Sequence, residues 1–153
     1  DSSIPVRAAL ARKLGRILPK MGEGATRAVA MQTLEALCAD TASAVREIVA
    51  VTLQDTTFLP PKLAIQLAED NERAVRAPVL RFCLSLSDDD LIELVRRGKR
   101  EWVPVEIAQR KSLSNAVALS IWESGNCEAA TLLLANQHAQ TPALVIEEAT
   151  DEA

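Results

Sequence analysis

Apolar residues recur along most of this chain at positions i, i+3, i+4, i+7 and i+8. Val45, Val49 and Leu53 are one example. This spacing is typical of an amphipathic α-helix, and we find no credible strand. Turns rich in Asp, Asn, Ser, Gly and Pro separate the apolar stretches. The pattern predicts an all-α protein of about ten helices, each needing neighbours to cover its single apolar stripe.

The first predicted helix covers residues 6–18 and is expected to bury Val6, Leu10, Leu14 and Ile17 or Leu18. Pro78 is expected to kink or delay a later helix. The predicted helices cover about residues 6–18, 23–39, 43–53, 61–68, 73–86, 87–97, 101–110, 114–125 and 126–136, and Thr141-Pro142 is expected to start one more.

A repeated pattern, Asp-x-x-x-x-Val-Arg, organises the first half of the chain. It occurs as Asp1…Val6-Arg7, Asp40…Val45-Arg46 and Asp70…Val75-Arg76. Helix pairs repeated every 25–40 residues or so are typical of α-solenoids. We therefore predict an α-α superhelix of about five stacked helix pairs. Residues 1–140 would form one domain that starts with a half-repeat, and residues 141–153 would begin a further helix or an acidic linker to a missing C-terminal region.

Composition narrows the class of protein. Of the 153 residues, 48% are hydrophobic and 3% aromatic, with no Tyr, which favours helices over a β-sandwich. No apolar run reaches the roughly 20 residues of a membrane span, and no signal-peptide pattern opens the chain. Cys38, Cys83 and Cys127 are interpreted as reduced, buried thiols of a cytoplasmic protein. One histidine, His138, does not make a metal site, so we expect no metal or other cofactor.

The net charge is −4, from 17 basic and 21 acidic residues. An acidic chain is a poor nucleic-acid binder, because phosphate affinity comes from clustered Lys and Arg. The sequence has no initiator Met, and its last residues are acidic and poor in apolar side chains. We interpret the chain as a piece of a longer protein.

The Asp-x-x-x-x-Val-Arg pattern, at the start of a second helix, resembles the HEAT repeat. The resemblance is good for the copies that end in Arg46 and Arg76. The later repeats depart from it, since Glu106 stands where Arg is expected and Ala129-Ala130 replaces Val-Arg. The resemblance implies a HEAT-like fold for the chain.

Four further stretches resemble a family of bacterial, mainly alphaproteobacterial, proteins catalogued only as a domain of unknown function with HEAT-like repeats. The resemblance covers most of residues 40–140, implies a cytosolic HEAT-like domain and implies no known activity. The stretches are Ala77-Pro-Val-Leu-Arg81, Leu86-Ser-Asp-Asp-Asp-Leu91, Ile107-Ala-Gln-Arg110 followed by Leu113-Ser114, and Leu133-Leu-Ala-Asn136.

Two sets of side chains are candidates for function. Arg7, Arg46 and Arg76 each follow a core Val, and they either bind the Asp of an adjacent turn in a structural ladder or form a basic stripe for an acidic partner. Arg81, Arg110 and Asn136 end successive second helices. They either bond the last free carbonyls of helices or form a ligand rim.

Other polar and aromatic features have simpler interpretations. Arg96–Arg100 is a solvated basic run at a helix C-terminus, or an anion patch if folding brings it to the basic residues of the first helix. Asp88, Asp89 and Asp90 suit a helix start better than a metal site. Trp102 and Trp122 are interpreted as core, although an exposed Trp would be a binding anchor.

We therefore predict a non-catalytic protein-binding or scaffold module that holds its partner on a concave face, with Arg46, Arg76, Arg81 and Arg110 as partner-binding candidates. No nucleophile elbow, phosphate loop or zinc motif supports an enzyme. One alternative is a nucleic-acid binder or DNA glycosylase-type enzyme, as some HEAT-like proteins are. Another is a self-assembly module, because terminal repeats expose apolar faces.

Overall fold

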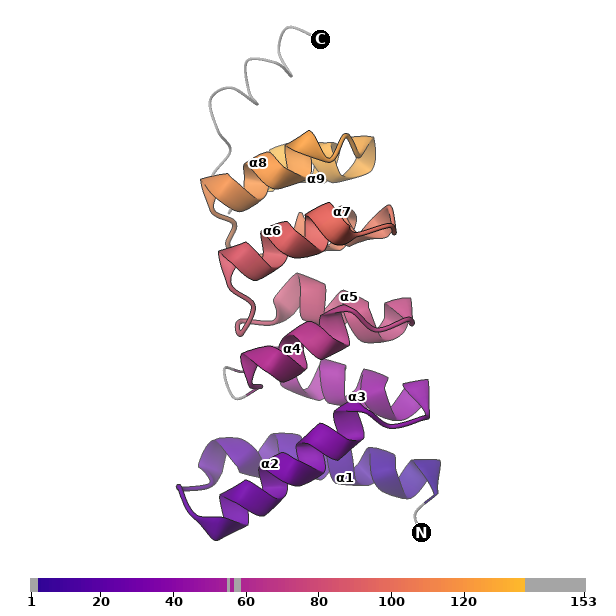
Figure 1. The fold of residues 1–153 in the computed structure, drawn as a ribbon, viewed down its shortest axis with the longest axis vertical. Helices are drawn as coiled ribbons and strands as arrows, with labels where there is room; N and C mark the ends of the chain where they lie inside the picture. The colour runs from indigo at the N-terminus through magenta and orange to yellow at the C-terminus, as the bar shows by residue number, and fades with distance from the viewer. Residues whose placement is uncertain (1–2, 55, 57–58, 137–153) are drawn as a thin grey trace, which may run out of the picture. The chain divides into compact units, whose positions relative to one another are not determined.

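A computed structural model of the chain describes residues 3–54, 56 and 59–136, and this part is built from helices joined by short turns (Figure 1). The predicted all-α class is confirmed. Within the described residues the helices are α1 (Ile4–Ile17), the 3-10 helix η1 (Leu18–Lys20), α2 (Ala25–Cys38), α3 (Ser43–Leu53), α4 (Pro61–Ala68), α5 (Arg73–Phe82), α6 (Asp88–Arg97), α7 (Trp102–Ile107), α8 (Asn115–Glu123) and α9 (Cys127–Ala135). The predicted helix at Thr141 lies outside them.

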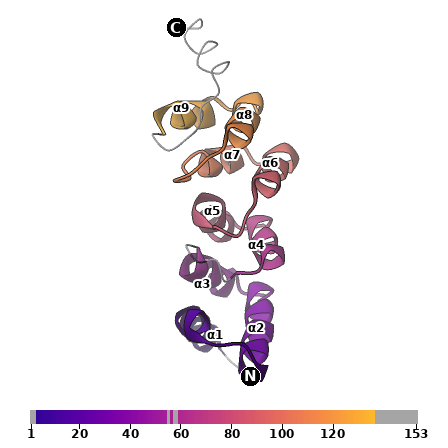
Figure 2. The ribbon, with the colours of Figure 1, turned by 90° about the vertical axis from the view of Figure 1, so that its left-hand side faces the viewer.

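The chain divides into two compact units. The first runs to Val79 and includes Cys83–Ser85, and the second holds Leu80–Phe82 and the chain from Leu86 on. In the first unit α1 packs on α3 and on α2, and α2 packs on α4. In the second unit α6 packs on α8 and α7 packs on α9. Figure 2 shows that alternate helices share a layer within each unit, such as α1 with α3 and α2 with α4.

Turn chemistry fixes several helix starts as the sequence predicts. Ser87 and Asp90 form a reciprocal capping box at the start of α6, which confirms the capping role of the acidic run. Ser114 caps α8 through the N–H of Val117. Pro78 lies inside α5, so it does not delay that helix.

The core of each unit consists of aliphatic side chains at the predicted helical spacing. Leucine and valine fill most of these positions because they pack densely without polar atoms. The largest fully buried side chains are Leu18, Leu34, Leu53, Leu59, Leu67, Leu80, Ile107, Ile121, Leu133, Val45, Val49 and Val75.

The prediction for the apolar face of α1 was partly wrong. Leu14 and Leu18 are buried, but Val6, Leu10 and Ile17 are exposed by 56%, 40% and 37%. The helix instead turns the small residues Ala8 and Ala11 inward. Small residues suit this place because α1 lies close to α3, and a longer side chain facing α3 would hold the two helices apart.

Two other burial predictions also need correction. Cys38 and Cys83 are buried as expected, but Cys127 is exposed at the first residue of α9. Trp102 and Trp122 are only partly buried.

Gly15 lies where α1 approaches α3 closely. A Cβ atom added there would lie 2.1 Å from Cγ2 of Thr52. We expect Gly15→Ala to lower the free energy of unfolding, because overpacking costs about 1–3 kcal/mol and exceeds the roughly 1 kcal/mol by which Ala favours a helix over Gly.

Denaturant unfolding in two backgrounds tests this explanation. In the Thr52→Ser background the clashing methyl group is absent, so Gly15→Ala should become neutral or stabilising. Equal destabilisation in both backgrounds would show that crowding against Thr52 is not the cause.

Candidate functional site

Arginine–carboxylate pairs link successive copies of the repeated pattern in the first unit. Nε and Nη2 of Arg7 donate to Oδ2 and Oδ1 of Asp40, at 2.6 and 3.0 Å. Nε and Nη2 of Arg46 donate in the same way to Asp70, again at 2.6 and 3.0 Å. Each Arg thus binds the Asp of the next copy. We call these two pairs the rungs, and they confirm the predicted ladder for Arg7 and Arg46.

Each rung is also tied to the turn that follows the carboxylate. Oδ1 of Asp40 accepts the N–H of Ala42, and Oδ1 of Asp70 accepts the N–H of Glu72. Nη1 of Arg46 donates to the backbone oxygen of Asp40 at 2.6 Å. The planar guanidinium therefore joins two turns that are far apart in sequence, a task to which its fixed fork of donors is suited.

Arg76, the third arginine of the pattern, bonds within its own repeat. Its Nε donates to the backbone oxygen of Ala68 at 2.6 Å, at the C-terminal end of α4. The guanidinium thus satisfies a carbonyl that has no partner inside the helix.

The candidates at helix ends in the second unit also have internal partners. Nη1 of Arg110 donates to the backbone oxygen of Leu80 at 2.7 Å, and Arg110 is buried. Nδ2 of Asn136 donates to the backbone oxygens of Ala108 and Arg110, at 2.8 and 2.9 Å. The expected capping is confirmed for both residues, and each bonds carbonyl oxygens 26 to 30 residues earlier in the chain rather than those of its own helix.

Arg81 has a carboxylate partner instead of a carbonyl. Its Nη2 and Nε donate to Oε2 of Glu106, at 2.7 and 3.1 Å. Glu106 is almost fully buried, with a side chain only 4% exposed. Glu106 stands where the repeat pattern expects Arg, and it binds Arg81, which lies 25 residues earlier and outside the pattern. Sequence reasoning missed this role, although a reversed charge at a repeat position was a usable signal.

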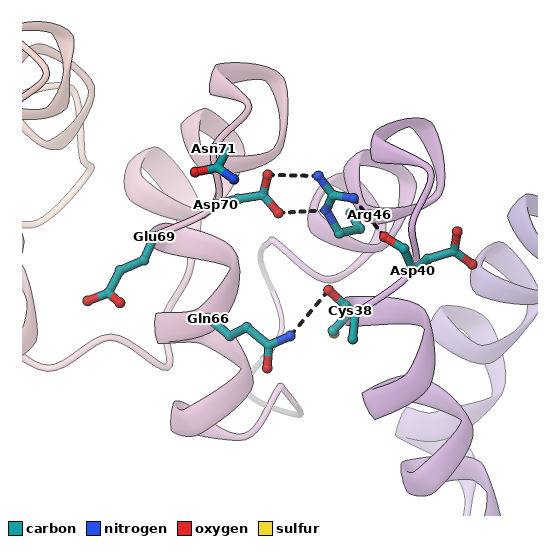
Figure 3. Close-up of a pocket in the computed structure, with 8 residues that line it drawn as sticks. Cys38, Asp40, Arg46, Gln66, Glu69, Asp70 and Asn71 are labelled. Carbon is teal, nitrogen blue, oxygen red and sulfur yellow. Dashed lines mark hydrogen bonds and ion pairs between the residues drawn. The ribbon is translucent and has the colours of Figure 1, made fainter.

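A polar hollow of about 320 Å³ surrounds the Arg46–Asp70 rung (Figure 3). The hollow lies entirely within the first unit. One wall is the turn after α2 and the other is the end of α4 with its turn, and Nε2 of Gln66 donates across to the backbone oxygen of Cys38 at 3.3 Å. The lining residues are Cys38, Ala39, Asp40, Arg46, Gln66, Glu69, Asp70 and Asn71.

The rungs hold the two carboxyl groups in the ionised form. Hydrogen bonds from Arg7 lower the pKa of Asp40, although burial opposes them. Burial of the Asp70 carboxyl raises its pKa, but the hydrogen bonds from Arg46 and from the N–H of Glu72 more than offset this, so the pKa lies below its usual value. Burial, and then the charge of Glu35, raises the pKa of Cys38 to about 12. The hollow therefore offers fixed charges, while the Cys38 thiol is buried and protonated.

The other candidates do not join this site. Arg96–Arg100 lies in the second unit, where Arg97 pairs with Glu93. His138 lies outside the described residues. Among the residues that the structure places, no group of three or more His, Cys, Asp or Glu side chains is arranged to hold a metal ion. In the same part of the chain, no helix has the length and apolar character to cross a membrane.

The lowered pKa values predict an acid transition in stability. The rungs stabilise the fold fully above the unfolded pKa of Asp, about 3.9, and this contribution is lost as the pH falls through the lower folded values. We expect Asp40→Asn/Asp70→Asn to be less stable than the parent at pH 7 and to lose less stability between pH 5 and pH 2. Urea unfolding at several pH values measures this. The exposed variant Asp89→Asn should follow the parent, and identical pH profiles for all three proteins would rule out the rungs as the cause.

A double-mutant cycle with Arg81→Met and Glu106→Gln tests the second-unit pair. Removing Arg81 takes an ion-pair partner from a buried carboxylate, whereas removing both charges avoids that cost. We expect a coupling free energy of about 1–3 kcal/mol from chemical unfolding. Additive effects of the two substitutions would show that the pair contributes only packing.

Residues 75–153 match a family described as "Uncharacterised protein conserved in bacteria (DUF2336)". No curated protein and no solved structure matches the chain. The matched region takes in the second unit together with most of α5, so it includes Arg81, Glu106, Arg110 and Asn136. The bacterial family of unknown function that the motifs resemble is thus confirmed. The chain belongs to this family of uncharacterised bacterial proteins.

Proposed function

We propose that this chain is a HEAT-like α-solenoid that works as a non-catalytic protein-binding module in the cytoplasm. The support for the fold comes from within each unit: alternate helices share layers, and long-range bonds of Arg or Asn connect successive pairs. Such modules bind partners along a layer of second helices or along the turns between helices.

The polar hollow is the observation that carries this proposal. The rung holds its walls in place, so its donors and acceptors are organised before a partner arrives, which reduces the entropic cost of binding. Small-molecule pockets are mostly apolar and bury most of the ligand. An open hollow lined by Asp40, Gln66 and Asn71 suits a polar segment of another protein better.

Of the four arginine candidates, Arg46 keeps a proposed role at this surface, because it contributes one side of the hollow. In the second unit Arg110 is buried, whereas the side chain of Arg81 remains 35% exposed beside Glu106. Because these arginines also carry internal bonds, charge reversal at Arg46 would remove a rung as well as a donor. A binding test therefore needs a residue that lines the hollow outside the rungs.

Asn71 is such a residue, because it is exposed at the rim of the hollow. We expect Asn71→Trp to fill the hollow and abolish partner capture, while leaving the fold intact as judged by circular dichroism. The measurement is affinity capture from a lysate of a bacterium that carries the gene, read by mass spectrometry.

Asn115→Trp is the matched control, since Asn115 is exposed in the second unit at the start of α8. A protein recovered with the parent and with Asn115→Trp, but lost with Asn71→Trp, supports the proposal. Equal recovery with all three baits, or recovery of nothing with any of them, would refute a binding role for the hollow.

A further inference from the structure

The helix α1 exposes an apolar stripe that the fold leaves uncovered. Val6, Leu10 and Ile17 lie within about 40° of one another around the helix axis, because successive residues advance by about 100°. All three are exposed by more than a third. We call them the α1 stripe. The helix packs on α2 and α3 through other residues, namely Ala8, Ala11 and Leu14.

Lys13 and Arg16 lie beside the α1 stripe, whereas Arg12 lies farther around the helix. Between Ser3 and Gly22 the chain has no acidic residue. Arg12, Lys13, Arg16 and Lys20 are all exposed, and Lys13 lies about 40° from the centre of the stripe. Arg7, the remaining cation of this segment, is engaged by Asp40. The exposed surface of α1 is therefore both apolar and cationic.

Charge complementarity points to an acidic partner, and the existing packing points to a helix. The helix α1 already packs on α3, and its Arg7 binds Asp40 in the turn before α3, next to the small buried residues Ala8 and Ala11. The α1 stripe also combines apolar residues with basic side chains, on a side of the helix that is exposed. From these observations we propose that the α1 stripe, with its basic flank, docks an acidic amphipathic helix of a partner protein.

Two other occupants fit the observations less well. An anionic membrane would repel a chain of net charge −4. The α1 stripe also has no aromatic residue of the kind that anchors interfacial helices. A symmetric dimer through the same stripe would bring Lys13 and Arg16 of two copies together, and like charges destabilise an interface.

This inference rests on the proposed binding function but uses a surface separate from the polar hollow. The test uses a panel of fluorescent helical peptides of about 20 residues, with Leu at helical spacing and Glu elsewhere, and measures anisotropy with residues 1–153. The sign-reversed panel carries Lys in place of Glu. We expect the acidic peptides to bind, with an affinity that falls as salt is added.

Leu10→Ser/Lys13→Glu should weaken binding about tenfold or more. The matched control is Val51→Ser/Lys62→Glu, which changes an exposed apolar residue of α3 and an exposed lysine of α4 and should bind as the parent does. Asn71→Trp should also bind as the parent does, so failure of the hollow and failure of the stripe are distinguishable. Circular dichroism establishes that each variant is folded.

Four results would overturn the inference. The first is no binding by any acidic peptide at low salt, and the second is equal binding of both panels. The third is binding to phosphatidylserine vesicles that Leu10→Ser/Lys13→Glu abolishes while the peptides stay unbound, which assigns the surface to a membrane. The fourth is a dimer, seen by light scattering, that the same variant dissociates, which assigns the stripe to a second copy.

Discussion

The guanidinium that reaches from one repeat to the next is the interaction on which the first unit depends. Arg46 binds both oxygens of Asp70 and also the backbone oxygen of Asp40. A single side chain thus fixes the distance between two turns, while the carboxylate it binds also accepts the N–H that starts the next turn. Aliphatic packing alone would allow the helices to slide, because it has no direction. The hydrogen bonds of the rung are directional, so they fix the position of one helix relative to the next.

The second unit also links helices that are distant in sequence, but it does so mainly through hydrogen bonds to backbone oxygens. Arg110 and Asn136 donate to backbone oxygens one repeat earlier, and Arg81 binds the buried carboxylate of Glu106. Arg110 and Asn136 thus satisfy carbonyl oxygens earlier in the chain, whereas Arg81 satisfies a carboxylate that lies 25 residues later. This part of the chain also carries the family match, so these bonds belong to the region that defines the family.

The sequence predicted the helices and the caps of helix starts because these depend on local spacing, and it predicted the rungs because the same Asp and Arg recur in successive copies. Asp40 and Arg46 carry their pattern within seven residues, and Ser87 with Asp90 forms a complete capping box. The face of α1 was mispredicted because Val6, Leu10 and Leu14 have helical spacing whether or not a neighbour covers them. The polar hollow was not predictable, since its walls come from turns that only tertiary packing brings together.

The rungs have a consequence for how such a chain changes in evolution. The two partners are 33 residues apart in one rung and 24 in the other, yet their bond lengths are the same. The copy from Asp40 to Arg46 supplies one donor forward, to Asp70, and one acceptor backward, to Arg7. A gene duplication that adds a whole copy therefore creates a complete new pair without any compensating substitution, and the stretch between partners is free to lengthen or shorten. The number of copies would then change, whereas the ion pair at each junction between copies would keep the same chemistry.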